Sequence, residues 1–123
     1  MTKRLLALLF ILALAVPAIV YAADFKCIGD RIEKNGSTWG YAKMSGSDYR
    51  IEKGSSSIAF VKNRNGKWAI EDLGSNTIGW LNGSRIETSN GSIWGSLSDA
   101  KSLCDGPDQV AAAIWALNKL GKL

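Results

Sequence analysis

The side chains of this chain that could do chemistry are carboxylates, serines, lysines and two cysteines, because the 123 residues include no histidine. Without imidazole the chain cannot form a Ser/His or Cys/His nucleophile pair, a histidine general base or a His-ligated zinc site. A hydrolase could still use two carboxylates across a cleft or a Ser-Lys pair, but no motif selects residues for either role. Calcium loops, phosphate-cradling loops and Cys-x-x-Cys pairs are also missing from the sequence. We therefore expect no enzymatic activity, no cofactor and no metal site.

The two cysteines, Cys27 and Cys104, indicate a disulfide if the chain is exported, because oxidising compartments favour paired cysteines. The cross-link would close a loop of about 77 residues, for which a chain-entropy argument gives about 4 kcal/mol. Both cysteines are expected at the same edge of the fold, beside the first and last strands.

The start of the chain has the three parts of a secretory signal peptide. Lys3 and Arg4 precede an apolar run, and cleavage after Ala22 would place small residues at positions −3 and −1. Because the run is short and Pro17 interrupts it, a membrane anchor is the weaker interpretation. The sequence predicts a secreted or periplasmic protein that keeps no stable membrane insertion after cleavage.

Cleavage would remove residues 1–22 and leave residues 23–123 as a single domain. Without Lys3 and Arg4 the 15 Lys+Arg fall to 13, against 11 Asp+Glu, so the net charge becomes +2. This small excess does not indicate a nucleic-acid partner. A domain of this length buries a core of modest size, and we expect a monomer.

One unit recurs four times and organises the domain. Its first part is a triplet with a central isoleucine and a final glutamate, found as Arg31-Ile32-Glu33, Arg50-Ile51-Glu52, Ala69-Ile70-Glu71 and Arg85-Ile86-Glu87. A Gly-Ser step follows each triplet. An apolar, a small and a bulky residue come next, as in Trp39-Gly40-Tyr41, Ile58-Ala59-Phe60, Ile78-Gly79-Trp80 and, less regularly, Trp94-Gly95-Ser96. Each unit predicts a strand, a tight turn and a second strand.

Polar and apolar residues alternate within the units, as over 49–52, which is typical of half-buried antiparallel strands. Asn-Gly pairs such as Asn65-Gly66 are the strongest short signal for a hairpin turn. Seven turns predict eight strands between about Lys26 and Leu97. The fold class is therefore expected to be mainly β: a small eight-stranded antiparallel up-and-down barrel, a meander of four hairpin repeats, with a C-terminal α-helix.

Closure of the sheet would give each strand an inner and an outer face. The inner face is expected to carry the bulky apolar residues, which are Ile28, Ile32, Trp39, Tyr41, Tyr49, Ile51, Ile58, Phe60, Trp68, Ile70, Ile78, Trp80 and Ile86. The Arg and Glu of the triplets should form a solvated outer face, with their stems over small neighbours such as Gly40 and Ala59. Ile93 and Trp94 compete for the inward direction, so one of them must face outward.

Beyond Leu97 the pattern becomes helical. Ser98 could cap a short helix over 99–103, and Pro107 suits the first position of a second helix. Apolar spacings of three and four and a glycine stop place this second helix at about 107–120. We expect it to pack on the barrel, and a dimer seam is the lesser alternative.

The expected layout of eight antiparallel strands and a helix resembles that of calycins, which bind apolar ligands inside a barrel. The Gly-x-Trp motif of lipocalins is absent, since 37–40 reads Ser-Thr-Trp-Gly. The segment 45–49, Ser-Gly-Ser-Asp-Tyr, is similar to a loop of bacterial periplasmic inhibitors of c-type lysozyme, but the downstream Trp-x-Lys-Gly element of that family is missing. Neither resemblance covers enough of the chain to assign a family.

The sequence favours a non-enzymatic binding module for an unidentified macromolecular target, such as a hydrolase that it inhibits or a component of the cell envelope. A carrier of small apolar ligands inside the barrel is the second hypothesis, and a minimal hydrolase is the third. A carrier needs a cavity in the barrel, whereas a core filled by side chains would leave none.

Two surfaces are candidate binding sites. Alternate turns of a meander lie on the same rim, and one rim collects small hydrogen-bonding residues, namely Asn35, Ser37, Ser55, Ser56, Ser75, Asn76, Asn90 and Ser92. The opposite rim would be braced by the disulfide and contains a basic turn with Lys62, Arg64 and Lys67, which is the alternative site. Duplication of one hairpin, with Gly-Ser steps kept for turn geometry alone, would explain the first set equally well.

Overall fold

The computed structural model describes residues 23–123, so the predicted signal peptide lies outside the described residues. Nine strands form an antiparallel meander: β1 (Phe25–Ile28), β2 (Arg31–Lys34), β3 (Ser37–Ser45), β4 (Asp48–Lys53), β5 (Ser56–Arg64), β6 (Lys67–Glu71), β7 (Thr77–Asn82), β8 (Arg85–Thr88) and β9 (Ile93–Ser96). Helix α2 (Leu97–Leu103), the two-residue strand β10 (Cys104–Asp105) and helix α3 (Asp108–Lys119) follow.

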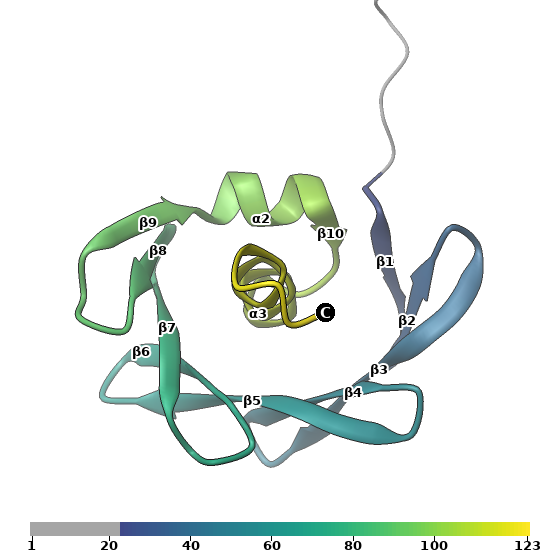
Figure 1. Ribbon diagram of the computed structural model, residues 1–123, viewed down its shortest axis with the longest axis horizontal. Coiled ribbons are helices and arrows are strands. Elements are labelled where there is room, and N and C mark those ends of the chain that lie inside the picture. The colour runs from purple at the N-terminus through teal and green to yellow at the C-terminus, as the bar shows by residue number, and fades with distance from the viewer. Residues whose placement is uncertain (1–22) are drawn as a thin grey trace, which may run out of the picture.

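The fold is mainly β with a C-terminal helix, but the predicted closed eight-stranded barrel is wrong. A turn at Gly29, whose φ is +62°, divides the predicted first strand into β1 and β2. The tenth strand, β10, pairs with β1 in the parallel direction, so the hydrogen-bonded order runs from β10 through β1 to β9. Strands β9 and β10 are the two ends of this open sheet, and α2 spans the space between them (Figure 1).

Helix α3 lies inside the curled sheet, where Figure 1 shows it nearly end-on and surrounded by the strands and α2. All eight residues from Val110 to Leu117 are buried, and the helix contacts β4, β5, β7 and β10 as well as α2. The predicted second helix is therefore present, but it fills the interior instead of packing on the outside of a barrel. A helix that is apolar on nearly every side is stable only in such a position.

A β-bulge in each of the four units reverses part of the predicted sidedness. The pairing shifts by one residue between the Ile and the Glu of every triplet, and this leaves one unpaired residue on the following strand. The unpaired residues are Trp39, Ile58, Ile78 and Trp94, and all four pack against the core. Each bulge therefore turns its apolar residue inward. The residue that follows it along the strand does not need to be bulky.

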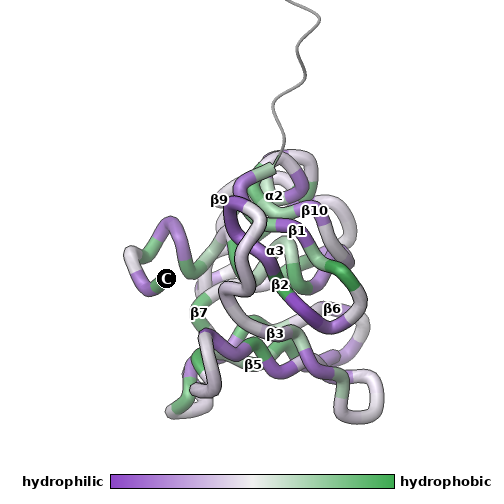
Figure 2. The backbone as a smooth tube through the Cα atoms, turned by 90° about the vertical axis from the view of Figure 1, so that its right-hand side faces the viewer, coloured by the Kyte–Doolittle hydropathy of each residue, from purple (hydrophilic) through white to green (hydrophobic). Residues whose placement is uncertain are grey.

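The small residue after each bulge also faces the interior. Gly40, Ala59 and Gly79 are buried, and a Cβ added to Gly40 would overlap the backbone oxygen of Glu52. The bulky third residues, which were expected in the core, lie on the outer side of the sheet instead; they are Tyr41, Phe60 and Trp80. Hydrophobic and hydrophilic residues both occur along the strands, as Figure 2 shows, and in β5 the apolar residues 58–61 precede the hydrophilic residues 62–64. The expectation that one of Ile93 and Trp94 faces outward is confirmed, because Ile93 is 73% exposed.

Helix α2 begins two residues earlier than the predicted 99–103 because Ser96, not Ser98, is its N-cap. The backbone N–H of Asp99 donates to Ser96 Oγ at 3.1 Å, and the backbone N–H of Ser96 donates to Asp99 Oδ2 at 3.2 Å. This reciprocal capping box satisfies two donors at the start of the helix. It thereby fixes the point where the chain leaves β9 and crosses the open side of the sheet.

Candidate binding surface

The outer side of the sheet carries a repeated arrangement of cations over buried carboxylates. Seven cationic side chains, each 31% to 53% exposed, form what we call the cation row: Arg31, Lys43, Arg50, Lys62, Arg64, Lys67 and Arg85. Each one lies within ion-pair distance of a triplet glutamate, and the glutamate side chains are only 3% to 19% exposed. The surface presented to solvent is therefore cationic, although carboxylates lie beneath it.

The best-connected unit is centred on Glu87 of β8. Lys67 Nζ lies 5.6 Å from the centre of the Trp80 ring and 3.3 Å from Glu87 Oε1. Arg85 Nε donates to Glu87 Oε2 at 2.9 Å, and the Asn82 amide donates to the same oxygen at 3.2 Å. The hydrogen bond from Asn82 makes the largest contribution to holding the pKa of Glu87 below its ordinary value, and those from Lys67 and Arg85 act in the same direction against the effect of burial.

The unit formed by β3 and β4 has the same geometry. Tyr41 lies directly opposite Glu52 in the strand pairing, and Lys43 Nζ is 5.3 Å from the centre of the tyrosine ring. The same ammonium lies 3.4 Å from Glu52 Oε1, while Arg50 Nε lies 2.8 Å from Glu52 Oε2. One lysine thus covers an aromatic ring and neutralises a buried carboxylate at the same time.

The third unit keeps this geometry although Ala69 replaces the arginine of its triplet. Lys62 Nζ lies 5.4 Å from the centre of the Phe60 ring and 3.4 Å from Glu71 Oε1. Arg64, from β5, supplies the second cation and donates to Glu71 Oε2 at 3.2 Å. Glu71 therefore also has two cations, although its arginine comes from β5 and not from its own triplet.

The prediction that the triplet glutamates are solvated is wrong for three of them, since Glu52, Glu71 and Glu87 are buried. A lone buried carboxylate would be costly, and two cations at each one provide the compensation. Sequence reasoning missed this arrangement, although a signal was present: a polar residue that can donate hydrogen bonds follows each outer aromatic by two positions. These donors are Lys43, Lys62 and Asn82.

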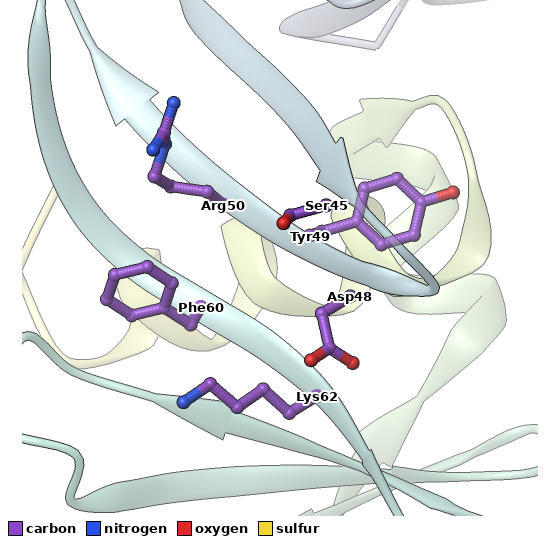
Figure 3. A pocket seen from close by; sticks show the side chains of 6 residues that line it. All are labelled: Ser45, Asp48, Tyr49, Arg50, Phe60 and Lys62. Carbon is purple, nitrogen blue, oxygen red and sulfur yellow. The ribbon is translucent and has the colours of Figure 1, made fainter.

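The predicted basic turn belongs to this outer surface. Lys62, Arg64 and Lys67 flank the β5–β6 hairpin, whose Asn65 and Gly66 adopt the positive φ angles of +55° and +85°. All three cations are engaged with triplet glutamates. A pocket of about 240 Å³ opens beside Lys62 and is lined also by Arg50 and Phe60, with Ser45, Asp48 and Tyr49 completing the wall (Figure 3).

The Gly-Ser residues gather at one edge of the meander because they occupy alternate turns. These are the turns before β3, β5, β7 and β9, and they contain Asn35, Ser37, Ser55, Ser56, Ser75, Asn76, Asn90 and Ser92, all exposed. Turn geometry accounts for several of them. Asn35 and Ser75 adopt left-handed φ angles of +54° and +65°, and the Asn76 side chain donates to Asp72 Oδ2 at 3.3 Å.

The structure also brings the two cysteines together. Strand β10 pairs with β1 so that Cys104 lies opposite Phe25, and Cys27 follows two residues later on β1. The Cys27–Cys104 pair has a separation of 4.2 Å, and both are thiols in this structure, without a disulfide between them. The expected proximity is confirmed, while the cross-link itself stays a prediction.

Comparison with protein-family models, with curated proteins and with solved structures found no match to this chain. Within residues 23–123, no three or more Cys, Asp or Glu side chains are grouped in a way that could hold a metal ion. Neither α2 nor α3 is long and apolar enough to cross a membrane.

Proposed function

We propose that this protein is a secreted or periplasmic, non-enzymatic binding module that engages an acidic macromolecule through its cation row. The single observation that carries this proposal is the layered arrangement of the outer surface, with half-exposed cations over buried glutamates. The position of α3 favours this proposal over a carrier of apolar ligands, because the helix lies where such a ligand would have to bind.

The charge balance of the surface favours an acidic partner. The cation row has seven positive charges over four glutamates, so this surface has an excess of three positive charges. Residues 23–123 as a whole have an excess of only two, so the remaining surface is slightly acidic. An outer surface of the sheet with an excess of positive charge attracts an oppositely charged macromolecule during its approach.

The ion pairs also prepare the cations for binding. Each arginine or lysine of the row is held by a carboxylate on one side while 31% to 53% of its side chain meets solvent. A partner carboxylate, sulfate or phosphate can accept hydrogen bonds from the remaining N–H groups. Less side-chain freedom is then lost on binding, because the ion pairs already hold these side chains in place. The guanidinium groups of Arg50, Arg64 and Arg85 suit this role because each has five donors.

The test measures retention of the purified protein on immobilised heparin, used as a defined polyanion. A triple variant, Lys43→Gln, Lys62→Gln and Lys67→Gln, removes three cations but leaves each buried glutamate its arginine. The matched control, Lys26→Gln, Lys53→Gln and Lys122→Gln, makes the same change in net charge elsewhere on the surface. We expect the first variant to elute at lower salt than the control, because fewer counterions are released on binding.

Equal elution of the two triple variants would contradict the proposal, since retention would then depend on net charge alone. A third variant, with alanine at Ser37, Ser56 and Ser92, tests the Gly-Ser rim. We expect it to elute with the unmodified protein. Loss of retention in this variant alone would assign binding to the rim instead.

A further inference from the structure

The two cysteines differ sharply in exposure although they lie side by side. Cys104 is fully buried beneath α3 and α2, whereas Cys27 is only partly buried. A reagent that approaches the folded protein therefore meets Cys27 first. This asymmetry is independent of the cation row and of the proposed function.

A pocket gives access to Cys27. It has a volume of about 260 Å³, and its lining includes Cys27, Met44, Tyr49 and Pro107. Met44 is 62% exposed, so the mouth of the pocket presents an apolar side chain to solvent. Cys104 is not among the residues that line this pocket. We expect an external disulfide to reach Cys27 through this pocket.

The chain next to the pair is shaped to the Cys27 sulfur. Gly106 packs so closely that a Cβ at this position would overlap Cys27 Sγ. The carbonyl oxygen of Gly106 accepts a hydrogen bond from Lys101 Nζ, which also lies 3.2 Å from Asp108 Oδ1. An ammonium group is thus held beside the cysteine pair at the start of α3.

These surroundings favour different protonation states for the two sulfurs. A hydrogen bond from the Cys104 thiol has the largest effect and lowers the pKa of Cys27. Burial and the charge of Asp105 oppose this effect, and the charge of Lys101 supports it. The pKa of Cys104 is raised, first by this hydrogen bond to Cys27 and then by burial. The accessible sulfur of Cys27 therefore has more thiolate character than that of Cys104. The thiolate is the form that reacts with disulfides.

We propose that Cys27 and Cys104 form a thiol–disulfide exchange site, in which Cys27 attacks an external disulfide and Cys104 resolves the mixed disulfide. In the first step the Cys27 thiolate bonds to one sulfur of the external disulfide, the external S–S bond breaks, and the other external sulfur leaves as a thiolate. In the second step Cys104 loses its proton and attacks Cys27 Sγ, which releases the second external thiol. Two electrons and two protons pass to the external disulfide, and the protein dithiol is oxidised to a disulfide.

The disulfide formed in this reaction would strengthen the shortest strand pairing of the sheet. Strand β10 is held to β1 by a pairing of only two residues, Phe25 with Cys104 and Lys26 with Asp105. A covalent link from β1 to β10 would secure this pairing and, through it, the start of α3. The exchange site would thus convert an exported, reduced chain into a more stable one.

The test uses the purified, reduced protein and oxidised glutathione as the external disulfide. We expect Cys104→Ser to accumulate a mixed disulfide at Cys27, because its resolving thiol is missing. Cys27→Ser should react with glutathione at least about tenfold more slowly, because its remaining thiol is buried. The unmodified protein should give an internal disulfide and two equivalents of reduced glutathione. In urea, the two single variants should react at similar rates.

Equal reaction of the two variants in the folded state, or no internal disulfide in the unmodified protein, would overturn the proposal. A second measurement guards against misfolded variants. Brief alkylation of the unmodified, reduced protein with a limiting amount of thiol reagent, followed by peptide mass spectrometry, should label Cys27 before Cys104. Labelling of Cys104 first would refute the assignment of Cys27 as the attacking thiol.

Discussion

Gly95 of β9 lies so close to Trp115 of α3 that a Cβ built on Gly95 would stand 2.5 Å from the indole ring. The same indole packs edge-on against Trp94, with ring centres 5.2 Å apart. The last strand of the meander therefore contacts the central helix through a residue without a side chain. This contact ties the position of α3 to the repeated small residue that follows each bulge.

Gly95→Ala should therefore destabilise the protein by about 1–3 kcal/mol, because the added methyl group must displace a packed indole. The matched control is Gly74→Ala, whose methyl group would meet only the side chains of the exposed Asn76 and the partly exposed Asp72. Urea unfolding followed by tryptophan fluorescence measures both variants. Equal losses in the two would mean that the Gly95–Trp115 contact does not fix α3.

A charge inside α3 should prevent stable folding. Ile114 is fully buried at the centre of the helix, so Ile114→Asp would place an unpaired carboxylate in the core and cost more than about 3 kcal/mol. Asn118→Asp, in the exposed last turn of the same helix, should change stability by less than about 0.5 kcal/mol. Thermal unfolding followed by circular dichroism compares them. An unchanged melting temperature for Ile114→Asp would show that the sheet folds without its central helix.

Local signals in the sequence predicted local structure well. The Asn35-Gly36 and Asn65-Gly66 turns adopt the positive φ angles that such pairs favour, and the helix expected at about 107–120 spans Asp108–Lys119. The position of that helix was not predicted, although a signal was available. Every residue from Val110 to Leu117 is apolar, and a helix with no polar side belongs in an interior.

The sidedness of the strands could not be predicted from alternation alone. A bulge inserts one residue into the period of two, so every position after it changes face. Tyr41 therefore lies outside although Trp39, two residues earlier, packs on the core. The buried glutamates were missed for a related reason: Glu71 finds its arginine on β5, and sequence order does not reveal that cross-strand partner.

The capping box at the start of α2 should make a measurable contribution to stability. Ser96→Ala removes the oxygen that accepts the N–H of Asp99 and should cost about 1 kcal/mol. Ser98→Ala is the matched control, because this neighbouring serine is exposed and is not the cap. Chemical unfolding measures the stability of both variants. An equal loss of stability in Ser98→Ala and Ser96→Ala would contradict the assignment of Ser96 as the cap.

Glu87 should make the stability of the protein depend on pH in the acid range. Because hydrogen bonds from Asn82, Lys67 and Arg85 hold its pKa below the ordinary value, the folded state releases this proton more readily than the unfolded chain does. The resulting stabilisation is fully present above the ordinary glutamate value of about 4.3 and is lost as the pH falls through the lower pKa of the folded state. Glu87→Gln has no carboxyl group to titrate at this position. We therefore expect it to be less stable than the unmodified protein at neutral pH, with the difference shrinking as acid is added. Urea unfolding at a series of pH values measures this, and two curves that stay parallel into strong acid would show that the ion pairs around Glu87 contribute nothing to folding.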